Sequence, residues 1–320
     1  MEEIKVMSYN IENMKKLFFN NEFALDKAEQ VKSLEKIITH QHPHILGIVE
    51  ASDKIKHHQY FIDNTGLKEL GYQIGKSDYK RGKQDLVVYY REPFEILTID
   101  DNIKFYDEWV EDIDQDGIKE VCEFERKPME ILFRLKGTDI TFLVILVATK
   151  SKGVFSINDV INHQHLALAN RKKLLAQSKK IRRRMDQLID EQPNLPLILM
   201  GDFNDEPGMD SYERILGASS IETVMGSVFD PDKILHNTMW YLNKTDRKKD
   251  LWTTEYPDLI VQNFGLHKAW LDHIFVSPNL LSESARFKYV MNSGEIILKD
   301  DDAKRASDHY AIYCKFEVSN

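Results

Sequence analysis

Short apolar runs recur along the whole chain, and most of them have the length of a single β-strand. Several runs are continuous rather than alternating, which is typical of strands that are buried in a core. Glycine, proline or polar residues follow the runs and separate them from one another. The runs predict strands at residues 4–11, 45–49, 85–90, 94–97, 141–147, 197–200, 270–277 and 310–316.

Two longer segments have apolar residues at helical spacing and predict α-helices between the strands. The first covers residues 24–41 and ends before Pro43, and the second covers residues 157–190. The second helix has a strongly basic face, which is either solvated surface or a surface for a polyanion. The basic residues of that face are Arg171, Lys172, Lys173, Lys179, Lys180, Arg182, Arg183 and Arg184.

Polar side chains stand next to an apolar run at the ends of six predicted strands. Each of them alone has an ordinary explanation, such as a turn that caps the strand. Together, and spread over the whole chain, they describe an active site on the rim of a β core. The six positions are Asn10, Glu50, the segment 148–152, Asp202 with Asn204, Asp272, and Asp308 with His309.

The segment 195–208 is the most informative of these, because a buried strand ends there in a carboxylate and a carboxamide. Asp202 and Asn204 are two residues apart, so in extended chain both side chains point to the same side. The carboxylate can hold a cation or take a proton from water, and the amide can orient that water or a phosphoryl oxygen. The pair suits phosphate chemistry, while an Asx-type turn is the alternative interpretation.

Two acidic features indicate cation sites. Glu50 directly follows five apolar residues, so it is either exposed at the strand end or neutralised by a cation. Residues 112–123 fit the calcium-loop pattern D-x-D-x-D-G-x5-E at every specified position. Pro128 and a strand-like run follow where an EF-hand would have its second helix, so a solvated acidic hairpin is the alternative. The side-chain donors of the calcium loop would be Asp112, Asp114, Asp116 and Glu123.

Composition and length narrow the class of protein. The 320 residues and 42% apolar content allow a large core, and no repeat or linker divides the chain, so we expect a single domain over residues 1–320. No apolar run reaches the ~20 residues of a membrane span, and the N-terminus lacks a signal peptide's apolar stretch. Two cysteines do not make a disulfide framework, which favours the cytoplasm. The net charge of −9 argues against a protein that coats nucleic acid.

Five short motifs follow one another along the chain: Ser8-Tyr-Asn-Ile11, Gly47-Ile-Val-Glu50, Gly201-Asp-Phe-Asn204, Leu271-Asp-His-Ile-Phe275 and Ser307-Asp-His309. They resemble the ordered motifs of the endonuclease/exonuclease/phosphatase superfamily, which includes DNase I-like nucleases, sphingomyelinases and inositol-polyphosphate phosphatases. The resemblance implies an α/β fold, a four-layer α/β sandwich of two packed, mainly antiparallel β-sheets flanked by helices. It also implies a metal-dependent phosphoesterase with its site in the loops at one edge.

The resemblance further implies a site for one divalent cation, Mg²⁺ or Mn²⁺. Glu50 would be the principal ligand, and Asn10 and Asp308 would lie close to the ion, directly or through water. Hard cations of this kind prefer oxygen donors, which all three residues offer.

The resemblance also gives roles to four residues of the acid-base machinery. Asp202 would activate or position the attacking water, and Asn204 would orient that water or the phosphate. His309 would face the phosphate, either as a base or as a cation, and Asp272 would accept its hydrogen bond. A carboxylate in that place fixes the tautomer of the imidazole and raises its pKa.

Ala148 departs from the family pattern, because most members have histidine two residues before Lys-Ser-Lys. A methyl group can neither donate a hydrogen bond to a phosphoryl oxygen nor protonate a leaving group. The alanine is either natural, in a weakened or repurposed member, or a replacement that inactivates the enzyme, and the intact neighbouring motifs favour the replacement. Lys150 and Ser151 remain the expected phosphate contacts in this segment.

We therefore expect a metal-dependent phosphodiester hydrolase with a phosphodiester substrate. A nuclease acting on DNA or RNA is favoured, because the basic helix and the aromatic residues within 209–265 suit a nucleic-acid strand. A phosphomonoesterase, or a phosphodiesterase of phospholipid or sugar phosphate, is the alternative of the same fold. A non-catalytic binder of a phosphate ligand is the alternative of another class, and the missing histidine would permit it.

Overall fold

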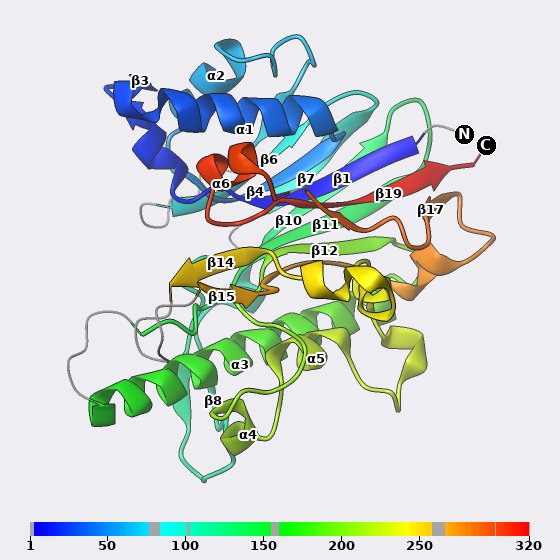
Figure 1. The fold of residues 1–320 in the computed structure, drawn as a ribbon. Coiled ribbons are helices and arrows are strands. Elements are labelled where there is room, and N and C mark those ends of the chain that lie inside the picture. Colours follow the sequence, from blue (N-terminus) through cyan, green and yellow to red (C-terminus); the bar gives the residue numbers. More distant parts are fainter. Residues whose placement is uncertain are drawn as a thin grey trace.

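Two large β-sheets pack face to face in the computed structural model, and helices cover the outer face of each sheet (Figure 1). The structure describes residues 3–76, 84–100, 103–154, 160–257, 266–297 and 299–319. The four layers agree with the sandwich that the sequence predicts, so the predicted fold class is confirmed.

The first sheet has β1 (Glu3–Asn10) and β4 (Ile45–Ser52) at its centre, and these two strands are parallel. The other pairings in this sheet are antiparallel. Its remaining strands are β5 (Gln73–Gly75), β6 (Gln84–Tyr90), β17 (Phe287–Tyr289), β18 (Glu295–Ile296) and β19 (Ile312–Val318).

The second sheet repeats this plan around β11 (Thr141–Ala148) and β12 (Leu197–Asp202), which are again a parallel pair. Antiparallel strands flank them on both sides. These are β7 (Phe94–Asp100), β10 (Met129–Leu135), β13 (His236–Asn237) and β16 (Asp272–Val276).

The helices form the two outer layers (Figure 1). On the first sheet lie α1 (Ala28–Gln41), α2 (Ile55–Asp63) and α6 (Asp301–Ala306). On the side of the second sheet lie α3 (Val160–Glu191), α4 (Glu213–Leu216) and α5 (Ser220–Met225). The predicted start of α3, residues 157–159, lies outside the described residues. Within the described ranges none of the helices has the length and apolar character that a bilayer crossing requires.

Short elements decorate this framework. The described part of residues 209–265 contains α4, α5, short 3₁₀ turns and the strands β13 and β14. The three small hairpins are β2 (Phe18–Phe19) with β3 (Glu22–Phe23), β8 (Trp109–Glu111) with β9 (Glu120–Cys122), and β14 (Thr254–Pro257) with β15 (Leu266–Ala269).

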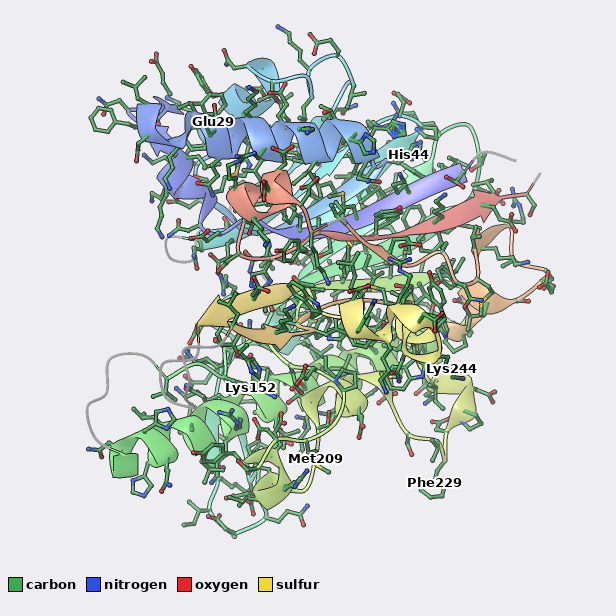
Figure 2. All side chains as sticks on the ribbon, viewed as in Figure 1. Glu29, His44, Lys152, Met209, Phe229 and Lys244 are labelled. Atoms are coloured by element: carbon green, nitrogen blue, oxygen red, sulfur yellow. The ribbon has the colours of Figure 1, made fainter. Side chains whose placement is uncertain are left out.

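Side chains of both sheets fill one common core between the two sheets (Figure 2). The sheets approach closely at Gly47, where an added Cβ atom would lie 2.5 Å from the Cε atom of Met200 and 2.8 Å from the Cδ1 atom of Leu146. A larger residue there would have to push the ends of these two side chains aside. This packing keeps the ends of β1 and β4 close to the ends of β11 and β12.

The basic face of α3 is not the free surface that the sequence indicated. Most of its cations are used inside the protein: Lys172 pairs with Asp114 and Glu120, and Arg184 pairs with Glu130. Arg171, Arg182 and Arg183 also meet carboxylates, and Lys180 lies over the rings of Phe105 and Trp109. The β8–β9 hairpin, which supplies several of these partners, could not be placed on the helix by sequence alone. The helix therefore gives little support for binding a nucleic acid.

Candidate active site

The two central parallel pairs bring polar residues from distant parts of the chain to one edge of the sandwich. In the first sheet Asn10 pairs with Val49, next to Glu50, and in the second sheet Ala148 pairs with Asp202. The carboxyl ends of parallel strands lie at the same edge, where α/β folds commonly bind ligands. The Asn10 amide joins the two sheets here, because it donates to Asp202 Oδ2 at 3.1 Å.

Asp202 is buried at the centre of this edge, with both carboxylate oxygens engaged. Oδ2 accepts the bond from Asn10, and Oδ1 accepts one from the backbone N–H of Asn204 at 2.9 Å. Burial, together with the nearby Asp272, raises the pKa of Asp202 to about 6, against the opposing effect of His309. A carboxylate with a raised pKa is suited to take a proton from an attacking water. Asn204 has a left-handed φ of 50°, and its amide donates to Thr149 O at 3.1 Å.

His309 and Asp272 form a buried ion pair beside Asp202. The Nδ1 atom of His309 lies 2.7 Å from Asp272 Oδ2. Burial disfavours the imidazolium, but the charge and hydrogen bond of Asp272 and the charge of Asp202 outweigh it and raise the pKa of His309 to about 10. The ion pair therefore favours the protonated form of His309. An imidazolium with Nδ1 fixed on a carboxylate can donate from Nε2 to a phosphoryl oxygen.

Glu50 reaches the same edge through an irregularity in β4. The pairing of β4 with β6 shifts register between Ile48 and Ala51, and Glu50 has a left-handed φ of 57°. A non-glycine residue adopts that conformation at an energetic cost, which is common at functional sites. Its Oε2 atom accepts from the backbone N–H of Asn13 at 2.9 Å and from Gln84 Nε2 at 2.6 Å.

Gln84 and Arg126 are site residues that sequence reasoning missed. The Gln84 amide is held at both ends, because its oxygen accepts from Arg126 Nη1 at 3.0 Å while its nitrogen donates to Glu50. This arrangement orients the Glu50 carboxylate and brings a guanidinium near it. Neither residue stands in a recognisable motif, so the sequence offered no signal for them.

Acidic and amide oxygens surround Asn10 on the Glu50 side. The Ser307 hydroxyl donates to Asn10 O at 2.7 Å, which places the following residue, Asp308, beside β1. Glu12, which the sequence did not single out, donates its N–H to Asn10 Oδ1 at 3.2 Å. Burial and the nearby charges of Asp308 and Glu50 raise the pKa of Glu12.

These residues fit a hard divalent cation. Glu12, Glu50 and Asp308 offer only oxygen atoms, which a hard divalent cation prefers. Asp202, Asp272 and His309 also offer ligand atoms within 4.8 Å of one another. In the described part of the chain the Glu50 side is not among the groups with ligand atoms this close together, so the cation site at Glu50, Asn10 and Asp308 stays a prediction.

The segment after Ala148 makes several polar contacts within the protein. Lys150 Nζ pairs with Glu125 at 2.8 Å, and the Ser151 hydroxyl accepts from the N–H of Gly153 at 3.1 Å. Lys152 points into a cluster of carboxylates. Ala148 itself stands opposite Asp202 in the sheet, so its side chain lies on the same face as the site. Substrate contacts of Lys150 and Ser151 remain predictions.

The acidic loop forms the tip of the β8–β9 hairpin. Ligand oxygens of Asp112, Asp114 and Asp116 lie within 4.8 Å of one another, and the Oδ1 atoms of Asp112 and Asp114 are buried without a hydrogen-bond donor. Glu123 is not in this group, contrary to the pattern. In an EF-hand a helix turns the twelfth residue back to the ion, whereas here β9 carries it away from the tip.

The sequence profile of the Endonuclease/Exonuclease/phosphatase family matches residues 7–309. No curated protein matches the chain by sequence. Truncated Caenorhabditis elegans TDP2 has a similar fold, with a TM-score of 0.58 and 15% identity over 98% of this chain and 97% of that one. D. rerio TDP2 complexed with single strand DNA product gives a TM-score of 0.56 and 15% identity over 99% of this chain and 100% of that one. The human Nocturnin catalytic domain with bound sulfate anion gives a TM-score of 0.53 and 15% identity over 99% of this chain and 95% of that one.

Proposed function

Since this chain belongs to the endonuclease/exonuclease/phosphatase family, a family of metal-dependent phosphoesterases, we propose that it hydrolyses phosphodiesters at the Asp202 edge, with a nucleic acid as its substrate. One observation carries the proposal. Asp202 is buried between the amide of Asn10 and the backbone of Asn204, beside the His309–Asp272 ion pair. A proton acceptor and a cationic donor therefore face one small region, as hydrolysis of a phosphodiester requires.

The reaction assigns a step to each side chain. A water attacks phosphorus, its proton passes to Asp202, and the new P–O bond forms. The bond to the leaving oxygen breaks, and the alkoxide takes a proton from solvent and leaves as the alcohol. Asn204 orients the water or a phosphoryl oxygen, and His309 donates a hydrogen bond from Nε2 to a phosphoryl oxygen as negative charge develops on it. Asp272 holds the imidazolium in place. Glu50, Asp308 and Glu12 would hold Mg²⁺ or Mn²⁺, which would neutralise phosphate charge when bound.

The choice of nucleic acid is supported by the relative from D. rerio, which is complexed with single strand DNA product. The basic face of α3 does not add to this support, because its cations are largely paired. Phosphomonoesters, phospholipids and sugar phosphates are the alternative substrates, and a non-catalytic phosphate binder is the alternative function. The test is a metal-dependent hydrolysis screen with DNA, RNA, sphingomyelin and inositol phosphates, on the present chain and on Ala148→His. Binding without turnover in both proteins would favour the binder.

Glu50→Gln is expected to abolish most of the affinity for Mg²⁺ and Mn²⁺. The neutral amide keeps the shape of the side chain but removes the charge that a hard cation needs. Calorimetric titration of each metal into both proteins measures this directly. Glu125→Gln, which neutralises another carboxylate near the site without touching Glu50, should bind the metals as the present chain does. Equal metal affinity in Glu50→Gln would place the cation elsewhere.

We also propose that the hairpin tip at Asp112, Asp114 and Asp116 binds Ca²⁺ apart from the active site. At about a hundredfold excess over its Kd, Ca²⁺ should then raise the melting temperature by about 5 °C. The shift should vanish in Asp114→Ala and persist in Glu50→Gln. Glu123→Gln should also keep the shift, because Glu123 is not in the group. If Ca²⁺ does not change the melting temperature, this tip is an acidic hairpin neutralised by Lys172.

A further inference from the structure

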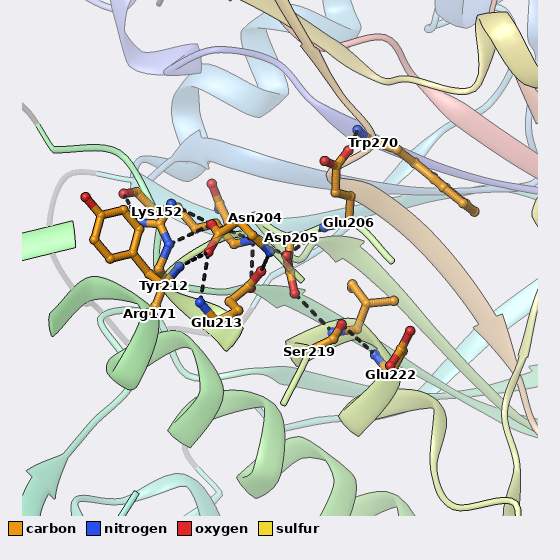
Figure 3. Close-up of polar contacts among 12 residues, drawn as sticks. Lys152, Arg171, Asn204, Asp205, Glu206, Tyr212, Glu213, Ser219, Glu222 and Trp270 are labelled. Carbon is orange, nitrogen blue, oxygen red and sulfur yellow. Dashed lines mark hydrogen bonds and ion pairs between the residues drawn. The ribbon is translucent and has the colours of Figure 1, made fainter. Parts of the chain in front are cut away.

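Behind the catalytic edge, Lys152 lies in a buried cluster of carboxylates (Figure 3). Its Nζ contacts Asp205, lies 2.7 Å from Glu213 Oε1, and lies 3.8 Å from Asp210 Oδ2. The side chain of Asp205 is 0% exposed and that of Glu213 is 3% exposed. Charges at such depth are stable only when they are paired, so each member of the cluster holds the others in place.

Both ends of the Lys152–Asp205 contact lead directly to the active site. Asp205 follows Asn204, whose amide donates to Thr149 O at 3.1 Å, and Thr149 stands three residues before Lys152. The segment with Thr149 and Lys152 is therefore joined twice to the segment with Asn204 and Asp205. A hydrogen bond joins them on the side of the active site, and an ion pair joins them behind it. Asp205 also accepts from the N–H of Ile221 at 3.2 Å, which anchors the loop to α5.

A second layer holds the cluster from the side of α3. Arg171 Nη2 lies 2.7 Å from Asp210 Oδ2, and its guanidinium lies 4.8 Å from the ring centre of Tyr212 (Figure 3). Glu213 accepts from the N–H of Asp210 at 2.8 Å, so the turn at residues 210–213 is closed on itself. The ammonium of Lys152 is therefore committed to the protein interior rather than to a substrate phosphate.

We propose that Lys152, Asp205 and Glu213 are positioning residues, which fix the Asn204 amide against Thr149 and thereby set where the phosphoryl group sits. The inference rests on the proposed hydrolase function. A displacement of ~1 Å in a group that orients a reacting atom can cost about 10²-fold in rate. The cluster acts through Asn204 and touches no substrate itself.

The charge balance gives the cluster a pH signature. Burial and repulsion from Glu213 outweigh Lys152 and raise the pKa of Asp205 from 3.8 to about 7. The native state then keeps a proton that the unfolded chain releases above pH 3.8. The stability contribution of Asp205 is full below that pH and is lost as the pH rises through about 7. The groups that face Asp205 are Lys152, Glu213 and the ring of His273 at its carbonyl, while Asp210 and Arg171 lie one contact further out.

Asp205→Asn tests the proposal, because it keeps the size of the side chain and removes its charge from Lys152. We expect kcat to fall by about 10–100-fold with KM within about twofold, while calorimetric Mg²⁺ binding stays unchanged. The melting temperature of the variant should also lose part of its dependence on pH between about 4 and 7. Hydrogen exchange of residues 149–154 and 203–205, followed by mass spectrometry, should become faster.

Glu222→Gln is the control, since it neutralises an exposed carboxylate on the neighbouring helix α5 that lies outside the Lys152 cluster. Its kcat and its exchange rates should stay close to those of the present chain. The proposal would be overturned if the kcat of Asp205→Asn equalled that of the present chain, or if kcat fell by the same factor in both variants. If Asp205→Asn does not fold, Glu213→Gln replaces it. If no phosphoester is hydrolysed at all, the proposed function fails, and unchanged exchange in Asp205→Asn would separately overturn the positioning role.

Discussion

His309→Ala is expected to lower kcat for phosphodiester hydrolysis by about 10³-fold, with a small effect on KM. Among the residues that the structure describes, the His309 imidazolium is the only cationic donor in the site that a carboxylate holds in place. Its Nδ1 atom lies 2.7 Å from that carboxylate, which belongs to Asp272. Its removal takes away the group that stabilises charge on the phosphoryl oxygen in the transition state. Steady-state kinetics at saturating metal, on the best substrate of the screen, measure the effect.

Two variants make this result specific. Asp272→Asn should lower kcat as well, because the imidazole loses the charge that keeps it protonated and oriented. His267→Ala removes a histidine of β15 that packs against Tyr256 of β14, and this variant should leave kcat unchanged. If His309→Ala retained full turnover while its metal affinity and melting temperature were unchanged, the assignment of the active site would be wrong.

Ala148→His is expected to raise kcat by about 10²–10⁴-fold, while substrate affinity changes far less. The site already contains the proton acceptor Asp202, the amide of Asn204 and the protonated His309, and the family pattern adds one donor at position 148. Because Ala148 pairs with Asp202 across parallel strands, a histidine there would point to the same face as that carboxylate.

The new side chain must fit a buried position, since Ala148 is 4% exposed. Ala148→Leu is therefore the control, because it adds similar bulk but no hydrogen-bond donor. Metal saturation in all three proteins separates a change in chemistry from a change in metal affinity. A gain in Ala148→His that Ala148→Leu does not share would identify the alanine as the missing donor. No gain on any substrate would mark the alanine as a native feature and strengthen the binder alternative.

The positions of the strands and the membership of the site were predictable from sequence because each depends on local order. A buried apolar run followed directly by a polar residue, as in 197–202, can be recognised in the sequence without knowing where the strand lies in the fold. Asn10, Asp202, Asp272 and His309 were predicted in this way and lie together in the structure.

What surrounds these residues was decided only by tertiary packing. Gln84 and Arg126 hold Glu50, and neither stands beside it in the chain or within a motif. Glu123 of the calcium pattern is not grouped with the three aspartates, because a strand and not a helix precedes it. A sequence pattern specifies residue types at given spacings. The direction of the element after the loop decides whether the twelfth residue, here Glu123, reaches the ion.

The lysines and arginines show the same limit most clearly. A sequence gives the charge of Lys152, Lys172 and Arg184, but not the carboxylates that they meet, since those partners lie at least 52 residues away in the chain. The free energy of a charge depends on its burial and its nearest opposite charge, and both are properties of the folded chain. The sequence alone therefore determined the strands and the chemistry available at their ends. Only the tertiary structure decided which cations remain free for a substrate and which are spent on holding the site in place.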